Sequence, residues 1–265
     1  MPTLDAAACT ALMDELTKIA AQAAEKILDF ANTATDVRTK ADNSPVTAAD
    51  EAAETVIRDG LARLAPELPI ISEEQAAREK PEAVGRGSYF LVDPLDGTRE
   101  FIAGRSEYTV NIAIMSNGVP MLGIVCAPAL GDFWRGIVGR GADRIAGAQA
   151  GRPTAIRTRA RPESEAVIMV SRSHLDARTR AYIENVPRAK IVQCGSAVKF
   201  ARLAEGAADL YPRLAPTHDW DVAAGHAVVT AAGGRLAAPD GSPLVYGTAD
   251  LLIPAFIAAG EPITA

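Results

Sequence analysis

The second half of the chain alternates between strand-like and helix-like segments, and this alternation limits the fold more than any other feature. Short apolar runs of the β type lie at 166–170, 190–193 and 208–211. Segments with helical periodicity follow them, at 177–185, 196–204 and 221–232. Such alternation is typical of proteins in which helices cover the faces of a sheet. We therefore predict an α/β fold built in layers.

The first half predicts helices packed against a sheet. Apolar residues recur every three or four positions from Leu4 to about Asn32, which indicates a long helix with one buried face. Turn residues at 40–46 precede Thr47, the expected N-cap of a second helix that Pro66 ends. β-type runs follow at 69–72, 89–92, 109–115 and 121–125. The stretch 131–165 has weak periodicity and is either surface β-structure or a seam between lobes.

Composition agrees with a folded globular chain. Of the 265 residues, 48% are hydrophobic and 23% charged, which suffices for a substantial core. We expect a single domain with an N-terminal α+β lobe over about 1–150 and a C-terminal α/β lobe over about 160–265. Acidic residues outnumber basic ones by 33 to 27 without a long Lys/Arg run, which argues against a nucleic-acid polymer as partner. A phosphorylated substrate would need bound cations to supply positive charge.

The cysteines and the termini bear on the compartment. Cys9, Cys126 and Cys194 are scattered, odd in number and without Cys-x-x-Cys spacing, so we expect small core residues in a reducing compartment. No basic stretch precedes an apolar one at the N-terminus, and the apolar run 251–259 contains Pro254 and is too short to cross a bilayer. A cytoplasmic protein without a transmembrane segment is expected.

The strongest chemical signal is the stretch Leu-Val-Asp-Pro-Leu-Asp-Gly-Thr at 91–98. Asp93 and Asp96 directly follow a short apolar strand, the place where functional loops of layered α/β proteins lie. Two carboxylates with the Leu95 carbonyl between them are hard oxygen ligands of the kind that Mg²⁺ prefers. Asp-Pro and Asp-Gly are also ordinary turn dipeptides, so this stretch alone leaves the turn and metal-site interpretations open.

Two more acidic positions could join these carboxylates. A second strand ends in Ser-Glu-Glu at 72–74, which offers Glu73 or Glu74, although a solvated turn is the simpler interpretation of that segment by itself. Asp221 opens a predicted helix, where a carboxylate is common merely as a cap or dipole partner.

Asp50 and Thr98 are candidates for handling a water molecule. Asp50 stands three residues after Thr47, the spacing of a capping box, and its second oxygen is then able to face a metal-bound water. Thr98 follows Gly97 and begins a short segment whose backbone N–H groups could bind phosphate oxygens. Gly97 would permit a close approach, and the Thr98 hydroxyl would orient a nucleophilic water.

Together these motifs resemble those of the inositol-monophosphatase superfamily of lithium-sensitive, magnesium-dependent phosphatases. The acid after a strand, the Asp-Pro-Leu-Asp-Gly-Thr stretch and the Trp-Asp pair at a helix start occur in the family's order. The match is closer to the 3′(2′),5′-bisphosphate nucleotidases of the CysQ type, whose motifs are similar to the segments 40–50, 72–74, 171–174, 195–196, 199–200 and 210–213. The resemblance implies an αβαβα sandwich of the sugar-phosphatase type.

The resemblance also implies roles for particular residues. The metal ligands, for two to three Mg²⁺ ions, would be Glu73, Asp93, the carbonyl of Leu95, Asp96 and Asp221. Asp50 and Thr98 would be the water-activating pair, and Gly97 would contact the phosphate. The second lobe would bind a second phosphate through Ser171, Arg172, His174, Ser196, Lys199 and Arg213, although a surface charge is the simpler interpretation of each cation. Asp219 departs from the family pattern, and we interpret it as the helix cap that frees Asp221.

By resemblance, the expected substrate is a nucleoside bisphosphate, adenosine 3′,5′-bisphosphate or its phosphosulfate analogue, in sulfur metabolism. One alternative is an inositol- or sugar-monophosphate phosphatase with the same metal core. Another is a catalytically silent metal-binding regulatory protein, which the presence of Asp50 and Thr98 disfavours because these residues serve water activation. The resemblance also allows a homodimer and a peripheral association with the inner face of the cell membrane.

Overall fold

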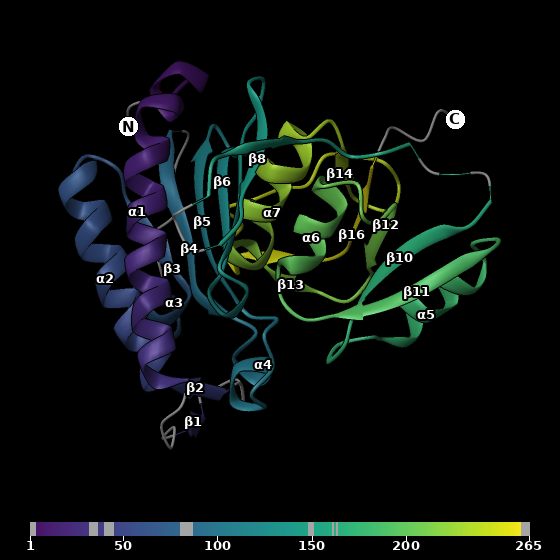
Figure 1. The fold of residues 1–265 in the computed structure, drawn as a ribbon, viewed down its shortest axis with the longest axis horizontal. Helices are drawn as coiled ribbons and strands as arrows, with labels where there is room; N and C mark the ends of the chain where they lie inside the picture. The colour runs from purple at the N-terminus through teal and green to yellow at the C-terminus, as the bar shows by residue number, and fades with distance from the viewer. Residues whose placement is uncertain are drawn as a thin grey trace.

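A computed structural model of the protein describes residues 4–31, 37–39, 45–79, 87–147, 151–160, 162 and 164–260. Two sheets alternate with helices in five layers (Figure 1). Helices α1 and α2 cover one face of a seven-stranded sheet, and α6 and α7 lie between that sheet and a five-stranded one. Helix α5 packs on the outer face of the second sheet. The predicted αβαβα sandwich is confirmed.

The two N-terminal helices form where the sequence predicts them. Helix α1 (Ala6–Phe30) begins at Asp5, whose carboxylate caps the first turn. Helix α2 (Ala48–Leu64) begins at the predicted cap Thr47, and Asp50 completes a capping box by accepting a 2.8 Å hydrogen bond from the Thr47 backbone N–H. Strands β1 (Val37–Thr39) and β2 (Pro45–Thr47) pair before α2. Most of the turn predicted at 40–46 lies outside the described residues.

The larger sheet runs in chain order from β3 to β9, with β3 parallel to β4 and every later pair antiparallel. Its strands are β3 (Ile70–Ser72), β4 (Ser88–Asp96), β5 (Thr109–Ser116), β6 (Val119–Ala127), β7 (Asp132–Ile137), β8 (Gly141–Ile145) and β9 (Thr154–Ile156). Short helices α3 (Glu73–Arg78), α4 (Thr98–Ile102) and η1 (Pro128–Leu130) follow β3, β4 and β6. The stretch 131–165, which has weak periodicity, therefore contains β-strands. They are not all at the surface, because β7 is buried along its whole length.

The smaller sheet has the order β11-β10-β12-β16-β14. Its strands are β10 (Ala166–Ser171), β11 (Ala189–Cys194), β12 (Leu210–Arg213), β14 (Arg235–Ala237) and β16 (Phe256–Ala259), and a two-stranded ladder joins β13 (Thr217–His218) to β15 (Leu252–Ile253). The helices between them are α5 (Ala177–Glu184), α6 (Val198–Ala204) and α7 (Asp219–Ala231). The predicted alternation up to α7 is present, whereas the pattern missed the short strands β14, β15 and β16.

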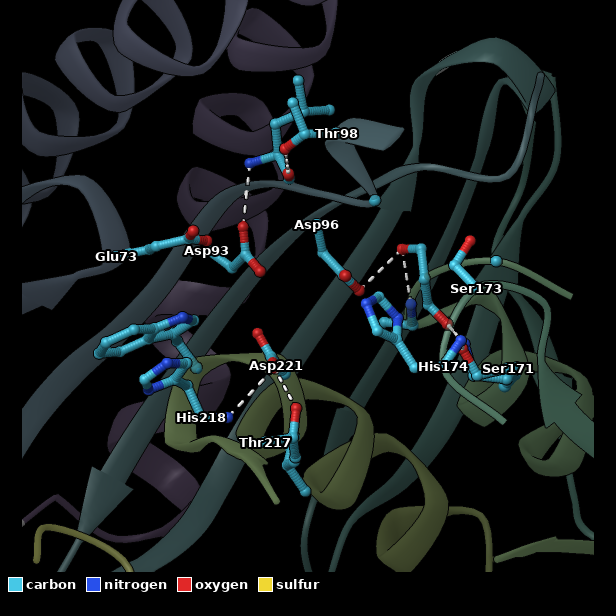
Figure 2. A pocket seen from close by; sticks show the side chains of 18 of the residues that line it. Glu73, Asp93, Asp96, Thr98, Ser171, Ser173, His174, Thr217, His218 and Asp221 are labelled. Carbon is cyan, nitrogen blue, oxygen red and sulfur yellow. Dashed lines mark hydrogen bonds between the residues drawn. The ribbon is translucent and has the colours of Figure 1, made fainter. Parts of the chain in front are cut away.

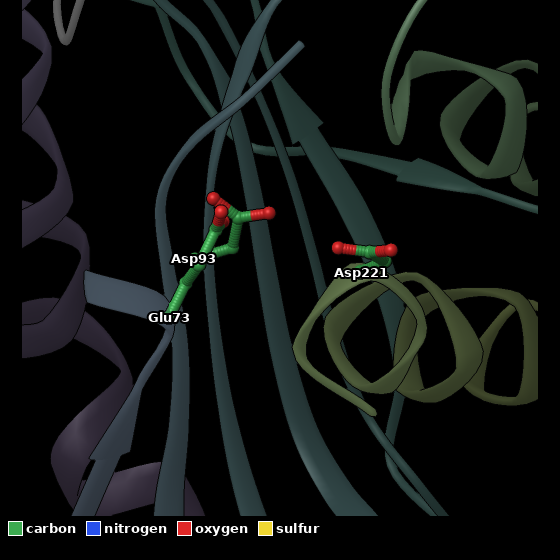
Figure 3. Close-up of side chains that lie close together, drawn as sticks. All are labelled: Glu73, Asp93 and Asp221. Carbon is green, nitrogen blue, oxygen red and sulfur yellow. The ribbon is translucent and has the colours of Figure 1, made fainter. Parts of the chain in front are cut away.

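Helix α7 lies unusually close to the larger sheet because glycines face it. A Cβ atom at Gly123 of β6 would lie 2.1 Å from the carbonyl oxygen of Ala224, and one at Gly136 of β7 would lie 2.7 Å from the Cα of Val228. Neither contact is compatible with a side chain. This packing sets the first turn of α7 opposite the end of β4 (Figure 3).

The three cysteines are free and buried, as predicted for core residues. Burial raises the pKa of Cys9 and of Cys194 to about 11, so both thiols stay protonated at neutral pH. In the described ranges, no helix has the length and apolar character needed to cross a membrane.

Candidate active site

A cavity of about 330 Å³ opens between the two sheets, where β4 and α4 meet the first turn of α7 (Figure 2). Twelve of the fourteen predicted site residues line it: Glu73, Asp93, Leu95, Asp96, Gly97, Thr98, Ser171, His174, Ser196, Lys199, Arg213 and Asp221. Asp50 and Arg172 are not part of its lining. The cavity therefore brings together residues from distant parts of the chain.

Three carboxylates converge in this cavity, those of Glu73, Asp93 and Asp221 (Figure 3). One oxygen from each lies within 4.8 Å of the others. Glu73 is the first residue of α3 and Asp93 lies in β4, while Asp221 faces them from α7. Three carboxylates at this separation repel one another unless a cation lies between them. Their oxygens are the type of ligand that hard divalent cations prefer. The donor set therefore fits Mg²⁺.

An irregularity in β4 sets the direction of its two aspartates. Asp93 pairs with Asn111 and Asp96 with Thr109, so that three steps along β4 match two along β5. In a regular strand, residues three apart point to opposite faces. The extra residue of the bulge restores a spacing of two, and both carboxylates reach the cavity. The sequence predicts a loop at this point, whereas the strand continues through Asp96.

Asp96 lies beside the three-acid cluster rather than in it. Its Oδ2 accepts hydrogen bonds from Ser196 Oγ at 2.8 Å and Asn111 Nδ2 at 3.4 Å. Burial raises the pKa of Asp96, and the carboxylate of Asp221 acts in the same direction. The structure therefore does not place all four predicted acids in one cluster. It does separate Glu73 from Glu74, because Glu74 is buried outside the cavity.

The first turn of α7 differs from the prediction. The N-cap is His218, and Asp219 is the first helical residue, buried with its Oδ2 accepting a 2.7 Å bond from the Gly247 N–H. Asp221 itself closes the turn, because its Oδ2 accepts from the His218 N–H at 3.1 Å and from the Thr217 hydroxyl. The interpretation of Asp219 as the cap was therefore wrong. The helix begins early enough for Asp221 to reach back to its start.

Asp50 and Thr98, the pair that the family resemblance implies, lie within hydrogen-bond distance of each other although they are 48 positions apart. The Thr98 hydroxyl lies 3.0 Å from Asp50 Oδ1 and 3.2 Å from the carbonyl oxygen of Leu95. It has one proton to donate, so it bonds one of these oxygens at a time. Gly97 precedes it with a left-handed φ of 89°, and a Cβ atom there would lie 3.2 Å from the Cβ of Ser196. Glycine here therefore serves a tight contact between the two halves of the cavity.

Two of the predicted second-lobe cations are engaged within the protein. Arg172 forms an ion pair with Glu107 and lies outside the cavity lining. Buried Lys199 donates to the carbonyl oxygens of Ser196 at 2.5 Å and Cys194 at 3.4 Å, with its ammonium 5.2 Å from the Tyr211 ring centre. Both side chains therefore stabilise the cavity wall.

Arg213 and His174 remain directed toward the cavity. Arg213 donates to the Pro216 carbonyl at 3.5 Å, and its buried Nε has no partner among the described residues. The His174 Nε2 lies 3.5 Å from Arg99 Nη1, and its backbone N–H donates to Ser171 Oγ at 3.1 Å. Partial desolvation lowers the pKa of His174, and the guanidinium groups of Arg213 and Arg99 act in the same direction. The neutral imidazole is therefore the main form of His174 at pH 7.

The sequence reasoning missed several residues that complete the site. Thr109 and Asn111 lie on β5, where Thr109 bonds Ser196 and Asn111 bonds Asp96. The sequence did contain a signal for them, because both are polar residues in an otherwise apolar strand. Ser173 lines the cavity and donates to buried Glu100 at 2.8 Å. Trp220 also lines it, with its ring stacked 4.5 Å from that of His218.

The fold and cavity define a layered αβαβα protein with an acidic centre between its two sheets. The chain matches the inositol monophosphatase family model over residues 8–262. It is 42% identical over 238 residues to the 3′(2′),5′-bisphosphate nucleotidase CysQ of Shigella flexneri, covering 89% of this chain and 94% of that protein. The CysQ of Escherichia coli strain K12 is 40% identical over 237 residues, with the same coverage.

A comparison with a solved structure leads to the same family. CysQ from Bacteroides thetaiotaomicron, described as a bacterial member of the inositol monophosphatase family, superimposes with a TM-score of 0.77 at 33% identity. The match covers 93% of this chain and 96% of that one. The chain belongs to the inositol monophosphatase family, and the resemblance inferred from its motifs is confirmed.

Proposed function

We propose that the chain is a Mg²⁺-dependent phosphomonoesterase that removes the 3′-phosphate of adenosine 3′,5′-bisphosphate, releasing AMP and inorganic phosphate. The observation that carries this proposal is the convergence of the Glu73, Asp93 and Asp221 carboxylates within 4.8 Å, in a cavity that Thr98 lines and links to Asp50. The substrate class is supported by the names of the relatives at 40–42% identity. The phosphosulfate analogue of the nucleotide is a second substrate of the same class.

The metal ligands in this proposal are Glu73, Asp93, Asp96, Asp221 and the carbonyl of Leu95, for two to three ions. Bound Mg²⁺ would supply a water of lowered pKa and positive charge for the phosphate oxygens. Asp93 is anchored for this task because its Oδ1 accepts a 3.1 Å bond from the Leu95 N–H. Glu73 follows Ser72, whose hydroxyl bonds buried Glu54 and so holds the start of α3.

The chain's own residues then handle the attacking water. The Thr98 hydroxyl orients the water, and the proton passes to Asp50, whose Oδ1 is 3.0 Å from the Thr98 oxygen. The water oxygen forms a bond to phosphorus while the bond between phosphorus and the 3′ oxygen breaks. The leaving 3′ oxygen keeps the electron pair of the broken bond and takes up a proton from bulk water, and Asp50 returns its proton to bulk water, so that one water molecule is consumed for each phosphate released.

The 5′-phosphate requires a positive contact of its own, and Arg213 supplies it in this proposal. Arg213 lines the cavity, and within the described part of the chain its buried Nε has no hydrogen-bond partner, so a donor remains for an anion. His174 adds a neutral donor nearby. These contacts favour a bisphosphate over inositol or sugar monophosphates.

The test compares phosphate release from adenosine 3′,5′-bisphosphate, inositol 1-phosphate and fructose 1,6-bisphosphate, each with Mg²⁺ and with excess EDTA. We expect Mg²⁺-dependent release, fastest from the nucleotide and inhibited by Li⁺. A preference for inositol 1-phosphate would transfer the assignment to the inositol phosphatases. Absence of hydrolysis from all three substrates, with Mg²⁺ bound, would indicate a catalytically silent metal-binding protein.

A further inference from the structure

The turn that carries Ser196 is held in a conformation that serines rarely adopt. Its φ of 53° is left-handed, where a Cβ atom is disfavoured, and such strain persists only when the surroundings impose it. Lys199 imposes it from one side by bonding the carbonyls of Cys194 and Ser196. On the other side, Gly195 packs so tightly that a Cβ atom there would lie 2.6 Å from the carbonyl oxygen of Glu107.

The hydroxyl of Ser196 is fully used by protein partners. It lies 2.8 Å from Asp96 Oδ2, 2.5 Å from Thr109 Oγ1 and 2.6 Å from the backbone nitrogen of Ala197. A serine hydroxyl has one proton and two acceptor lone pairs. Its proton goes to Asp96 Oδ2, so the Thr109 hydroxyl and the Ala197 N–H donate to the Ser196 oxygen. No donor or lone pair is left for a substrate phosphate.

We propose that Ser196 is a positioning residue for Asp96 and does not contact the substrate. Its bond holds Asp96 Oδ2, the same oxygen that Asn111 approaches, and thereby directs Oδ1 to the cation. The strained turn follows β11 of the smaller sheet and places the Ser196 hydroxyl against Asp96, which lies on β4 of the larger sheet. The inference deepens the proposed function and rests on its metal-dependent chemistry.

The principal variant is Ser196→Gly, since glycine adopts the same φ without strain while the change removes the hydroxyl together with the Cβ that carries it. Mg²⁺ binding is measured by titration calorimetry in the absence of substrate. We expect an affinity about 10-fold weaker than that of the wild type, the usual effect of losing a group that orients a metal ligand. At saturating Mg²⁺, the KM for adenosine 3′,5′-bisphosphate should stay within about twofold. A substrate contact would instead raise KM and leave Mg²⁺ affinity unchanged.

A double-mutant cycle tests whether Ser196 acts through Asp96. In an Asp96→Asn background, Ser196→Gly should weaken Mg²⁺ binding no further, because both changes act on one carboxylate. Thr109→Val removes only one support of the Ser196 hydroxyl and should give a smaller loss, which keeps the proposal testable if Ser196→Gly does not fold. Ser242→Ala is the matched control, since Ser242 is an exposed serine bonded to Asp240.

The outcomes separate this inference from the proposed function. If the wild type binds no divalent cation, the metal site of the proposed function fails, and Ser196 has no ligand to position. If the wild type binds Mg²⁺ and Ser196→Gly binds it equally well, only the role of Ser196 is overturned. A further tenfold loss from Ser196→Gly in the Asp96→Asn background would also overturn it.

Discussion

The two walls of the cavity use charge in opposite ways. On the acid wall, formed by Glu73, Asp93 and Asp221, charges of one sign converge within 4.8 Å. On the basic wall, Lys199 is engaged with backbone carbonyls, and the buried Nε of Arg213 has no hydrogen-bond partner among the residues that the structure describes. Clustered like charges call for a counterion from outside, whereas a cation satisfied within the protein stabilises structure. In the proposed function, the acid wall therefore holds cations and the basic wall binds one anionic group.

The largest effect should come from the acid wall. Asp93→Asn keeps an oxygen for the 3.1 Å bond from the Leu95 N–H but removes the charge, so the fold should survive. We expect kcat/KM for the bisphosphate to fall by about 1000-fold, since metal-assisted charge stabilisation contributes several kcal/mol to such reactions. The measurement is phosphate release, with circular dichroism as the check on folding. Retention of more than a tenth of the activity would show that Asp93 holds no essential cation.

Asp50 separates water activation from metal binding. In Asp50→Asn, kcat should fall by about 100-fold while Mg²⁺ affinity measured by calorimetry stays the same, because Asp50 is in our proposal a proton acceptor and not a ligand. Asp5→Asn is the matched control, since Asp5 also caps a helix, accepting from the N–H groups of Ala7 and Ala8, and none of these three residues lines the cavity. Equal losses of kcat in the two variants would mean that Asp50 acts only as a cap.

The predicted cations offer a direct contrast between Arg213, which lines the cavity, and Arg172, which forms an ion pair outside its lining. Arg213→Ala should raise the KM for adenosine 3′,5′-bisphosphate by about 10-fold or more, the range expected for a charge-assisted hydrogen bond. Arg172→Ala should change it by less than about threefold, because that guanidinium is paired with Glu107. Initial rates over a range of substrate concentrations decide this. The opposite ranking would place the 5′-phosphate against Arg172.

The smallest effect concerns the charge of His174. Its pKa lies below the ordinary 6.5, mainly through desolvation, so the neutral imidazole is the main form in the free enzyme at both pH 7 and pH 8.5. His174→Asn should therefore change the KM for the bisphosphate by the same factor at the two pH values. Comparing wild type and variant at each pH cancels the titration of the substrate. A wild-type advantage that grows several-fold toward pH 7 would indicate a protonated imidazole.

The contrast between the walls also explains what the sequence could predict. The acids were recognisable because their order along the chain and the strand or helix at which each stands are local features. The partner of a cation is set by tertiary structure: Glu107 is 65 positions from Arg172, and the carbonyls that hold Lys199 depend on a strained turn. The bulge in β4 was equally invisible, because it exists only relative to β5.

For the fold, the alternation of segments sufficed to predict the layers but not every strand. β14, β15 and β16 contain two to four residues each, too short to show a period of two. β7 was not predicted because a glycine and an arginine interrupt its apolar pattern, and both residues are explained only by tertiary contacts. Gly136 makes room for α7, and buried Arg135 pairs with Asp143 at 2.8 Å. Asp219 misled because an aspartate near a helix start is a common cap, whereas here it is buried and bonded to Gly247.

The close approach of α7 to the larger sheet has a consequence for how the protein can vary. Asp221 reaches Glu73 and Asp93 because α7 rests on Gly123 and Gly136, and neither glycine belongs to the cavity. A methyl group at either position would move the helix, and with it one side of the acid wall. In a library of random variants scored for phosphatase activity, Gly123 and Gly136 should therefore tolerate substitution as poorly as the acids of the cavity do. Over evolutionary time, the position of Asp221 is then maintained by residues that never meet a substrate.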